Sequence, residues 1–99
     1  MQIMVWVFEV EDKFGKKIHL SKERWSHIVT EHPQLSDKID EIKEIVKNPL
    51  TVMHSKYDEE VRFYYKYYKK LSNYLMVSVK YLNGEGFIIT AFYTKKLEK

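Results

Sequence analysis

The spacing of the hydrophobic residues changes at Pro49, and this change limits the folds open to the chain. Before Pro49, apolar residues recur every three or four positions, as they do in amphipathic helices. After Pro49, apolar and polar residues alternate, as they do in strands with one buried face. The alternation covers four short stretches, residues 50–56, 61–68, 74–81 and 87–94. Their connections are short, so we expect an antiparallel meander, because a parallel crossover needs about a dozen residues or more.

The part of the chain before Pro49 predicts a β-hairpin and two helices. Residues 2–11 form the first strand of the hairpin, and residues 17–20 form the second after a turn at residues 13–16. Ser21 and Ser36 are suited to cap the two helices, which end before Pro33 and Pro49 because the residue before a proline is disfavoured in a helix. Their apolar stripes hold Trp25, Ile28, Val29 and His32 in the first helix and Ile39, Ile42, Ile45 and Val46 in the second.

The resulting order, ββααββββ, predicts an α+β fold in which helices cover one face of an antiparallel sheet. A chain of 99 residues is long enough for one compact domain. We therefore expect a single domain over residues 1–99, with the hairpin in residues 1–20, the helices in residues 21–48 and the meander in residues 50–96.

Composition excludes several classes of protein. The chain has no Cys, which excludes a disulfide scaffold, a Cys-rich zinc site and a cysteine nucleophile. The longest apolar run, residues 3–8, is too short to cross a bilayer and lacks the features of a signal peptide, so we expect a cytoplasmic protein without membrane contact. The richness in Lys and Glu fits a thermophilic source, although an AT-rich genome would give a similar bias.

Positive charge gathers in the second half of the chain. Residues 1–49 hold 8 basic and 9 acidic residues, whereas residues 50–99 hold 9 basic and 5 acidic ones. Residues 61–70, VRFYYKYYKK, carry four positive charges and five aromatic rings. Lys and Arg neutralise phosphates and aromatic rings stack on unpaired bases, so this stretch predicts nucleic-acid binding.

Alternation assigns the strand residues to two faces of the sheet. Phe63, Tyr65 and Tyr67 are expected to face the helices. The opposite face is then basic and rich in hydroxyl groups, as a solvated sheet face also is by default. It is expected to hold Arg62, Tyr64, Lys66, Tyr74, Ser78, Lys80, Thr90 and Thr94.

Histidine is the side chain best suited to proton transfer near neutral pH, and the chain has four. His32 lies in the apolar stripe of the first helix and His27 on its polar side, so each has a structural as well as a catalytic interpretation. His19 and His54 lie near turns and are assigned no role. His27 and His32 are five positions apart and do not converge on one ion, and no H-E-x-x-H motif occurs, so no metal or cofactor is predicted.

Several short motifs, in this order and spacing, resemble a prokaryotic and phage-associated family. It is grouped with nucleases of the barnase–EndoU–colicin–RelE-like fold, and the resemblance runs from about residue 18 to residue 96. The motifs are Leu20-Ser21-x-x-Arg24-Trp25-x-His27-Ile28, His32-Pro33, Arg62-x-Tyr64-Tyr65-Lys66 and Gly86-Phe87-Ile88-Ile89-Thr90-Ala91-Phe92-Tyr93-Thr94.

The resemblance implies a metal-independent endoribonuclease, in which a ribose 2′-hydroxyl attacks the adjacent phosphorus. It implies a catalytic role for His27, His32, Arg62 and Thr90, with the choice between the two histidines left open. In addition, four residues are expected to contact the substrate: Tyr64, Lys66, Lys80 and Thr94. As a small domain the chain would be a toxin-like or housekeeping ribonuclease, with an antitoxin or immunity protein as a candidate partner.

A different class of function fits the same residues. The basic aromatic face would also serve a non-catalytic module that binds single-stranded RNA or another protein. An exposed aromatic strand can pair with a second copy, so both a monomer and a homodimer remain open.

Overall fold

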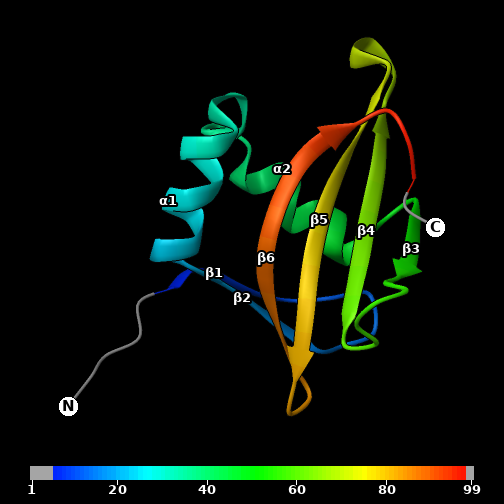
Figure 1. Cartoon of the computed structure of the whole chain (residues 1–99). Helices are drawn as coiled ribbons and strands as arrows, with labels where there is room; N and C mark the ends of the chain where they lie inside the picture. The colour runs from blue at the N-terminus through cyan, green and yellow to red at the C-terminus, as the bar shows by residue number, and fades with distance from the viewer. Residues whose placement is uncertain (1–5, 98–99) are drawn as a thin grey trace.

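The computed structural model describes residues 6–97, and its elements follow the predicted order (Figure 1). The expected first strand began at residue 2, and its residues 2–5 lie outside the described part. Two short 3-10 turns, η1 and η2, complete the order. The elements are β1 (Trp6–Glu11), β2 (Lys17–Ser21), α1 (Lys22–Glu31), η1 (Pro33–Leu35), α2 (Ile39–Lys47), β3 (Thr51–His54), β4 (Val61–Tyr68), η2 (Lys69–Leu71), β5 (Asn73–Leu82) and β6 (Glu85–Thr94).

The sheet has six strands in the order β1-β2-β6-β5-β4-β3. Strands β3 to β6 form the expected antiparallel meander, and the α+β class is confirmed. The extent of the sheet was wrong, because the hairpin joins it through a short parallel pairing of β2 with β6. Gly86 allows this approach: a Cβ there would meet the Ile18 side chain and lie 2.8 Å from Cγ1 of Val79.

The helix caps were predicted in part. Ser21 caps α1, because its Oγ accepts a hydrogen bond from the backbone N–H of Arg24 at 3.1 Å. Ser36 does not cap α2. It ends the η1 turn, and α2 begins after Lys38 without a side-chain cap. No helix in the described part of the chain is long and apolar enough to span a membrane.

The core lies between α2 and one face of the sheet, which we call the inner face. Figure 1 shows α2 behind the strands and α1 beside β6. Ile42, Ile45 and Val46 of α2 are fully buried and belong to the same cluster as Leu75 and Val77 of β5. Burial of these side chains is the main term that stabilises the sheet against the helix.

The prediction of which residues of β4 face the helices was wrong. Residues directly opposite in a ladder share a face, and Tyr64 pairs with Val77 while Arg62 pairs with Val79. Arg62, Tyr64 and Lys66 therefore lie on the inner face with α2. Strand β4 is aromatic on both faces, so its alternation could not choose between them.

Candidate functional site

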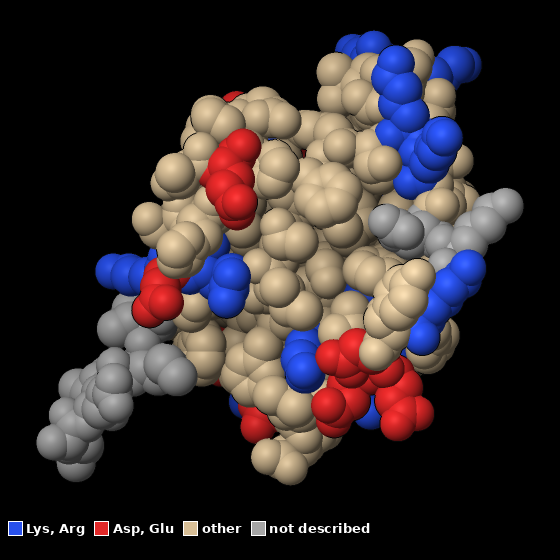
Figure 2. All heavy atoms as spheres, viewed as in Figure 1, with Lys and Arg blue, Asp and Glu red and all other residues tan. Residues whose placement is uncertain are grey.

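The face of the sheet opposite α2, which we call the outer face, is turned toward the viewer in Figures 1 and 2. Its centre is uncharged, and basic and acidic atoms lie around its margin. Part of the outer face is shielded from solvent, since Tyr65, Met76 and Ser78, which lie on it, are buried. By their pairing its residues on β4 to β6 are Val61, Phe63, Tyr65, Tyr67, Tyr74, Met76, Ser78, Lys80, Phe87, Thr90, Phe92 and Thr94.

A cavity of about 240 Å³ lies where the first turn of α1 meets the outer face. Arg24 of α1 and Lys80 of β5 supply two positive charges to its wall. The imidazole of His19 lines it as well, together with the rings of Trp6 and Phe87. Two cations, an imidazole and aromatic rings form a suitable surface for a phosphodiester and its base.

His19 is buried and contacts a carboxylate at each ring nitrogen. Its Nε2–H donates to Oε1 of Glu85 at 2.5 Å. Its Nδ1 lies 2.7 Å from Oε2 of Glu9, without the alignment of a hydrogen bond. The ring stacks on Phe87 with centroids 5.1 Å apart and contacts Trp6 at 4.5 Å. Packing and carboxylates together fix the orientation of the imidazole, as proton transfer requires.

Pairing with the neighbouring strands places His19 on the outer face. Ile18 and Leu20, on either side of it in β2, are fully buried in the core. Since side chains alternate along a strand, His19 points the other way. Its cross-strand partner is Glu9, and Glu85 comes from the start of β6.

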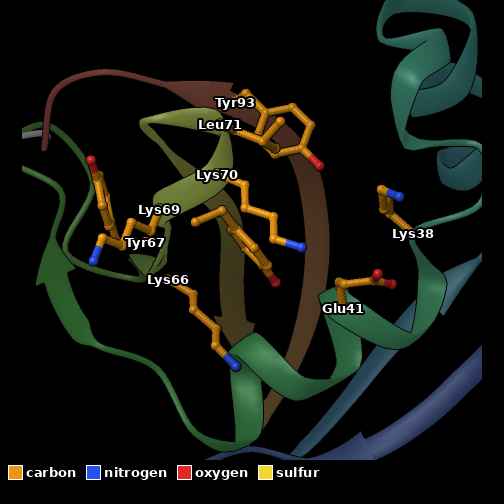
Figure 3. Close-up of a pocket in the computed structure, with 9 residues that line it drawn as sticks. Lys38, Glu41, Lys66, Tyr67, Lys69, Lys70, Leu71 and Tyr93 are labelled. Carbon is orange, nitrogen blue, oxygen red and sulfur yellow. The ribbon is translucent and has the colours of Figure 1, made fainter.

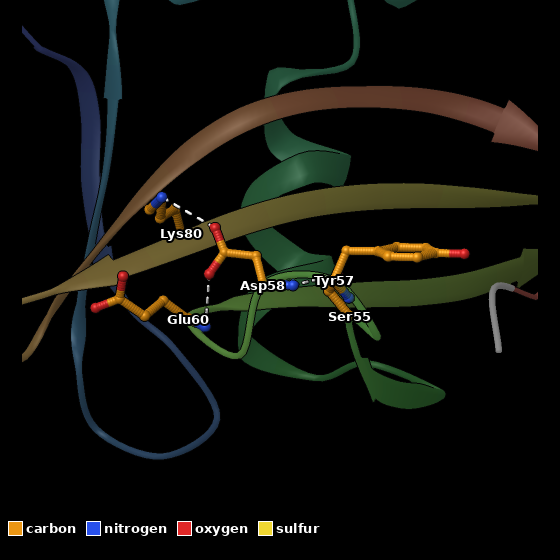
Figure 4. A network of polar contacts seen from close by, with 5 residues as sticks. All are labelled: Ser55, Tyr57, Asp58, Glu60 and Lys80. Atoms are coloured by element: carbon orange, nitrogen blue, oxygen red, sulfur yellow. Dashed lines mark hydrogen bonds and ion pairs between the residues drawn. The ribbon is translucent and has the colours of Figure 1, made fainter.

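Lys80 is held at the cavity by Asp58, which belongs to the turn between β3 and β4 (Figure 4). Its Nζ donates to Oδ2 of Asp58 at 3.0 Å, and the backbone N–H of Glu60 donates to Oδ1. The hydrogen bond from Lys80 lowers the pKa of Asp58, with the Glu60 N–H as a second cause, and raises the pKa of Lys80. The ammonium of Lys80 therefore stays protonated, and the carboxylate of Asp58 offsets part of its charge at the margin of the site.

Thr90 and Thr94 lie on the outer face, as expected. Thr90 pairs with Ser78, so it is a diagonal neighbour of Lys80, with a bulge in the ladder between them. The hydroxyl of Thr94 is used locally, because it donates to the carbonyl oxygen of Lys96 at 3.2 Å and accepts from the Lys96 N–H at 3.3 Å.

Neither His27 nor His32 lines the cavity beside His19. His27 is exposed on α1. His32 follows the last turn of α1, and its ring lies 5.7 Å from that of Phe92, further along β6 than Thr90. His32 therefore reaches the outer face, but beside a different part of it from the cavity.

Three other predicted site residues lie on the inner face. The guanidinium of Arg62 stacks over the ring of Tyr81 at 4.7 Å and over Phe14 at 5.4 Å. Tyr64 is buried and its hydroxyl lies 2.5 Å from that of Tyr81. Lys66 lines a second cavity. The structure thus brings Lys80 and Thr90 together and separates them from Arg62, Tyr64 and Lys66.

The hydroxyls of Tyr64 and Tyr81 complete a buried polar cluster around Asp12. Tyr81 donates to Oδ2 of Asp12 at 2.6 Å, and Oδ1 of Asp12 accepts from the N–H groups of Phe14 and Lys16. Burial raises the pKa of both phenols, and the hydrogen bond to Asp12 raises that of Tyr81 further. The cluster joins the hairpin turn to the meander.

The site residues predicted from the sequence did not include His19, Arg24, Trp6, Phe87 or Glu85. One signal was present: a hairpin with its turn at residues 13–16 pairs Glu9 with His19 across the two strands. The contribution of Glu85 had no such signal, because it depends on the pairing of β2 with β6. Among the described residues, no three His, Asp or Glu side chains are placed to hold a metal ion.

Comparison with known proteins gives the class of protein to which the chain belongs. The model of the family described as phage-Barnase-EndoU-ColicinE5/D-RelE like nuclease2 matches residues 7–99. The chain belongs to this family of nucleases, which supports a nuclease-type function and a nucleic-acid substrate. Searches of curated proteins and of solved structures found no match.

Proposed function

We propose that the chain is a metal-independent endoribonuclease and that cleavage takes place in the outer-face cavity beside His19. One observation carries the proposal: an imidazole with a carboxylate at each ring nitrogen lines the same cavity as Arg24 and Lys80. Acid–base groups next to phosphate-binding cations are what phosphodiester cleavage needs. Membership of a nuclease family supports the same conclusion.

The proton-transfer unit is the pair formed by His19 and Glu85. Glu85 is half exposed, so a ribose can reach its carboxylate. The carboxylate removes the proton of the 2′-hydroxyl, and the oxygen attacks the adjacent phosphorus. The bond from phosphorus to the 5′-oxygen breaks, and the same unit returns the proton to that oxygen. The products are a 2′,3′-cyclic phosphate and a 5′-hydroxyl. DNA lacks the attacking hydroxyl, so the reaction is specific to RNA.

Arg24 and Lys80 stabilise the charge that develops on the phosphorane. The planar guanidinium of Arg24 can donate two parallel hydrogen bonds to phosphate oxygens, whereas Lys80 acts as a point charge. Thr90, diagonal to Lys80, offers a hydroxyl to a neighbouring phosphate oxygen. His32, beside Phe92, contacts RNA further along β6 and takes no part in proton transfer.

This assignment differs from the one implied by family resemblance, which gave catalysis to His27, His32, Arg62 and Thr90. Arg62 is on the inner face, stacked on Tyr81 and Phe14, and here it has a structural role. The toxin-like role, an antitoxin or immunity partner and the cytoplasmic location stay predictions.

The test is cleavage of labelled RNA in EDTA by wild type, Glu85→Gln, Arg24→Gln and Arg62→Gln. Lys22→Gln, an exposed change of equal charge on α1, is the matched control for Arg24. We expect cyclic phosphate ends, a loss of about 10²–10⁴-fold in Glu85→Gln and about 10²-fold in Arg24→Gln.

Two results would contradict the proposal. If Arg62→Gln abolished cleavage while Glu85→Gln and Arg24→Gln kept it, the site would lie on the inner face. If wild type bound RNA without cleaving it, the non-catalytic RNA-binding module would be the better description.

A further inference from the structure

The basic, aromatic stretch of residues 61–70 takes almost no part in the outer-face site, yet half of it lines a second cavity. This cavity, of about 380 Å³, lies at the end of β4 on the inner side of the sheet. We call it the η2 groove, after the turn that forms part of its wall. From residues 61–70 it takes Lys66, Tyr67, Tyr68, Lys69 and Lys70.

The wall facing this stretch comes from other elements (Figure 3). Figure 3 shows Lys66 and Lys70 on one side of the groove, Lys38 and Glu41 on the other and Tyr93 above. A third cavity, of about 360 Å³, shares Lys38, Leu71 and Tyr93 with the groove, so the hollow continues toward η1. The combined space is large enough for more than one ring system.

Positive charge predominates in the η2 groove. Four lysines and one glutamate line it. Lys38 is paired with Asp37 at 3.3 Å. Lys66, Lys69 and Lys70 form no ion pair with a carboxylate within residues 6–97. Figure 2 shows basic side chains gathered over the turn between β4 and β5. Figure 3 shows the side chains of Lys66 and Lys70 on the groove side, whereas that of Lys69 extends away from it. Unpaired ammonium groups at one hollow attract a polyanion.

Aromatic rings give the groove a second property. Tyr68 and Tyr93 are partly buried in its wall, and burial raises the pKa of both phenols above the ordinary value of 10.0. Tyr67 lies on the outer face by its pairing with Tyr74 and lines the groove as well. It therefore marks a path by which an extended chain can pass from the outer face to the groove.

We propose that the η2 groove is a second nucleotide-binding site, which holds an unpaired nucleotide of RNA away from the point of cleavage. Lysines bind its phosphates, and the tyrosine rings stack on its base. This inference rests on the proposed function, because it extends the same RNA beyond the cavity beside His19. An acidic protein would fit the charge but would leave the aromatic wall without stacking partners, so RNA is the occupant that the groove favours.

The test separates binding in the groove from cleavage. The probe is a fluorescent single-stranded 12-nucleotide RNA with 2′-O-methyl groups throughout, which cannot be cleaved by 2′-hydroxyl attack. Its affinity is measured by anisotropy over a range of salt concentrations for wild type and for Lys69→Glu/Lys70→Glu. The control is Lys47→Glu/Lys56→Glu, two exposed lysines outside every cavity described above, with the same change in net charge.

We expect Lys69→Glu/Lys70→Glu to weaken binding about tenfold more than the control and to reduce the salt dependence, as loss of about two phosphate contacts does. Tyr93→Leu should weaken binding about fivefold or more, and Tyr93→Phe should restore it, because stacking needs the ring and not the hydroxyl. Melting curves identify any variant that has lost its fold.

Cleavage of a dinucleotide, which is too short to reach the groove, gives the second measurement. Lys69→Glu/Lys70→Glu should cleave it at the wild-type rate. Equal affinity of this variant and its control for the methylated RNA would overturn the inference. If groove-dependent binding persisted while no RNA was cleaved by any form, the groove would stand and the proposed ribonuclease would fail.

Discussion

Arg62 and Thr90 lie on opposite faces of the same sheet. Arg62 pairs with Val79 on the inner face, and Thr90 pairs with Ser78 on the outer face. The two side chains therefore cannot act on one phosphate, although both belong to the motifs that resemble the nuclease family.

Arg62→Gln should affect stability and leave cleavage unchanged. The guanidinium stacks on Tyr81 and Phe14, and loss of such contacts costs about 0.5–2 kcal/mol in the free energy of unfolding. Lys80→Gln should do the reverse, with a small change in melting temperature and a large loss of RNA cleavage. Thermal denaturation and RNA cleavage in parallel check both. Unchanged melting with lost cleavage in Arg62→Gln would show that Arg62 contacts substrate.

Tyr81→Phe should weaken the response of stability to alkaline pH. Burial and Asp12 hold the pKa of Tyr81 above its ordinary value of 10.0. Above pH 10 the unfolded chain loses the phenolic proton while the folded protein keeps it, so the free energy of unfolding of wild type falls as pH rises. Tyr81→Phe should show a shallower fall, and should lose about 1.5–3 kcal/mol at neutral pH with the hydrogen bond to the carboxylate.

The control for Tyr81→Phe is Tyr57→Phe, because Tyr57 is 96% exposed. Urea unfolding of both variants at several alkaline pH values gives the comparison. A slope for Tyr81→Phe as steep as that for Tyr57→Phe would mean that Tyr81 ionises alike in the folded and unfolded chains.

Asp58→Asn should strengthen RNA binding. Asp58 pairs with Lys80 at 3.0 Å and competes with phosphate for its ammonium. Because both side chains are substantially exposed, we expect a gain of about two- to fivefold in affinity for uncleavable RNA. Glu59→Gln, an exposed neighbour with the same change in charge, is the control. An equal gain in both variants would indicate a general charge effect rather than release of Lys80.

Gly86→Ala should separate the hairpin from the meander. The added Cβ would meet Ile18 and Val79 in the parallel pairing of β2 with β6. We expect about 2–4 kcal/mol of destabilisation, as for other forced overpacking in a core, together with loss of RNA cleavage. Gly84→Ala meets no atom within 4 Å but is strained at φ +83°, so it should cost only about 1 kcal/mol and keep activity. Hydrogen exchange of the β2 amides would follow the separation directly.

Local patterns were enough to predict the order of the α-helices and strands of this fold. The capping role of Ser21, the helix end at Pro33 and the short loops of the meander are encoded within a few residues of where they act. The face of β4 was not encoded in this way. Tyr64 is buried on the inner face, where its hydroxyl contacts Asp12, 52 positions away, and Tyr81.

The candidate site was predicted less well, for a related reason. Lys80 and Thr90 follow from alternation along β5 and β6, and the structure places them as neighbours. His19 becomes a site residue only when β2 pairs with β6, which brings Glu85 to its Nε2 from 66 positions away. A periodicity of two reports which way a side chain points but not which strand will lie beside it.

The parallel pairing of β2 with β6 also bears on synthesis of the protein. His19 is synthesised before its partner Glu85, 66 positions later, and before β6, the strand that holds β2 in place. The two parts can meet only after β6 has left the ribosome. In the proposed ribonuclease, a nascent chain from which β6 has not emerged, or a chain truncated before β6, would therefore have no assembled acid–base pair.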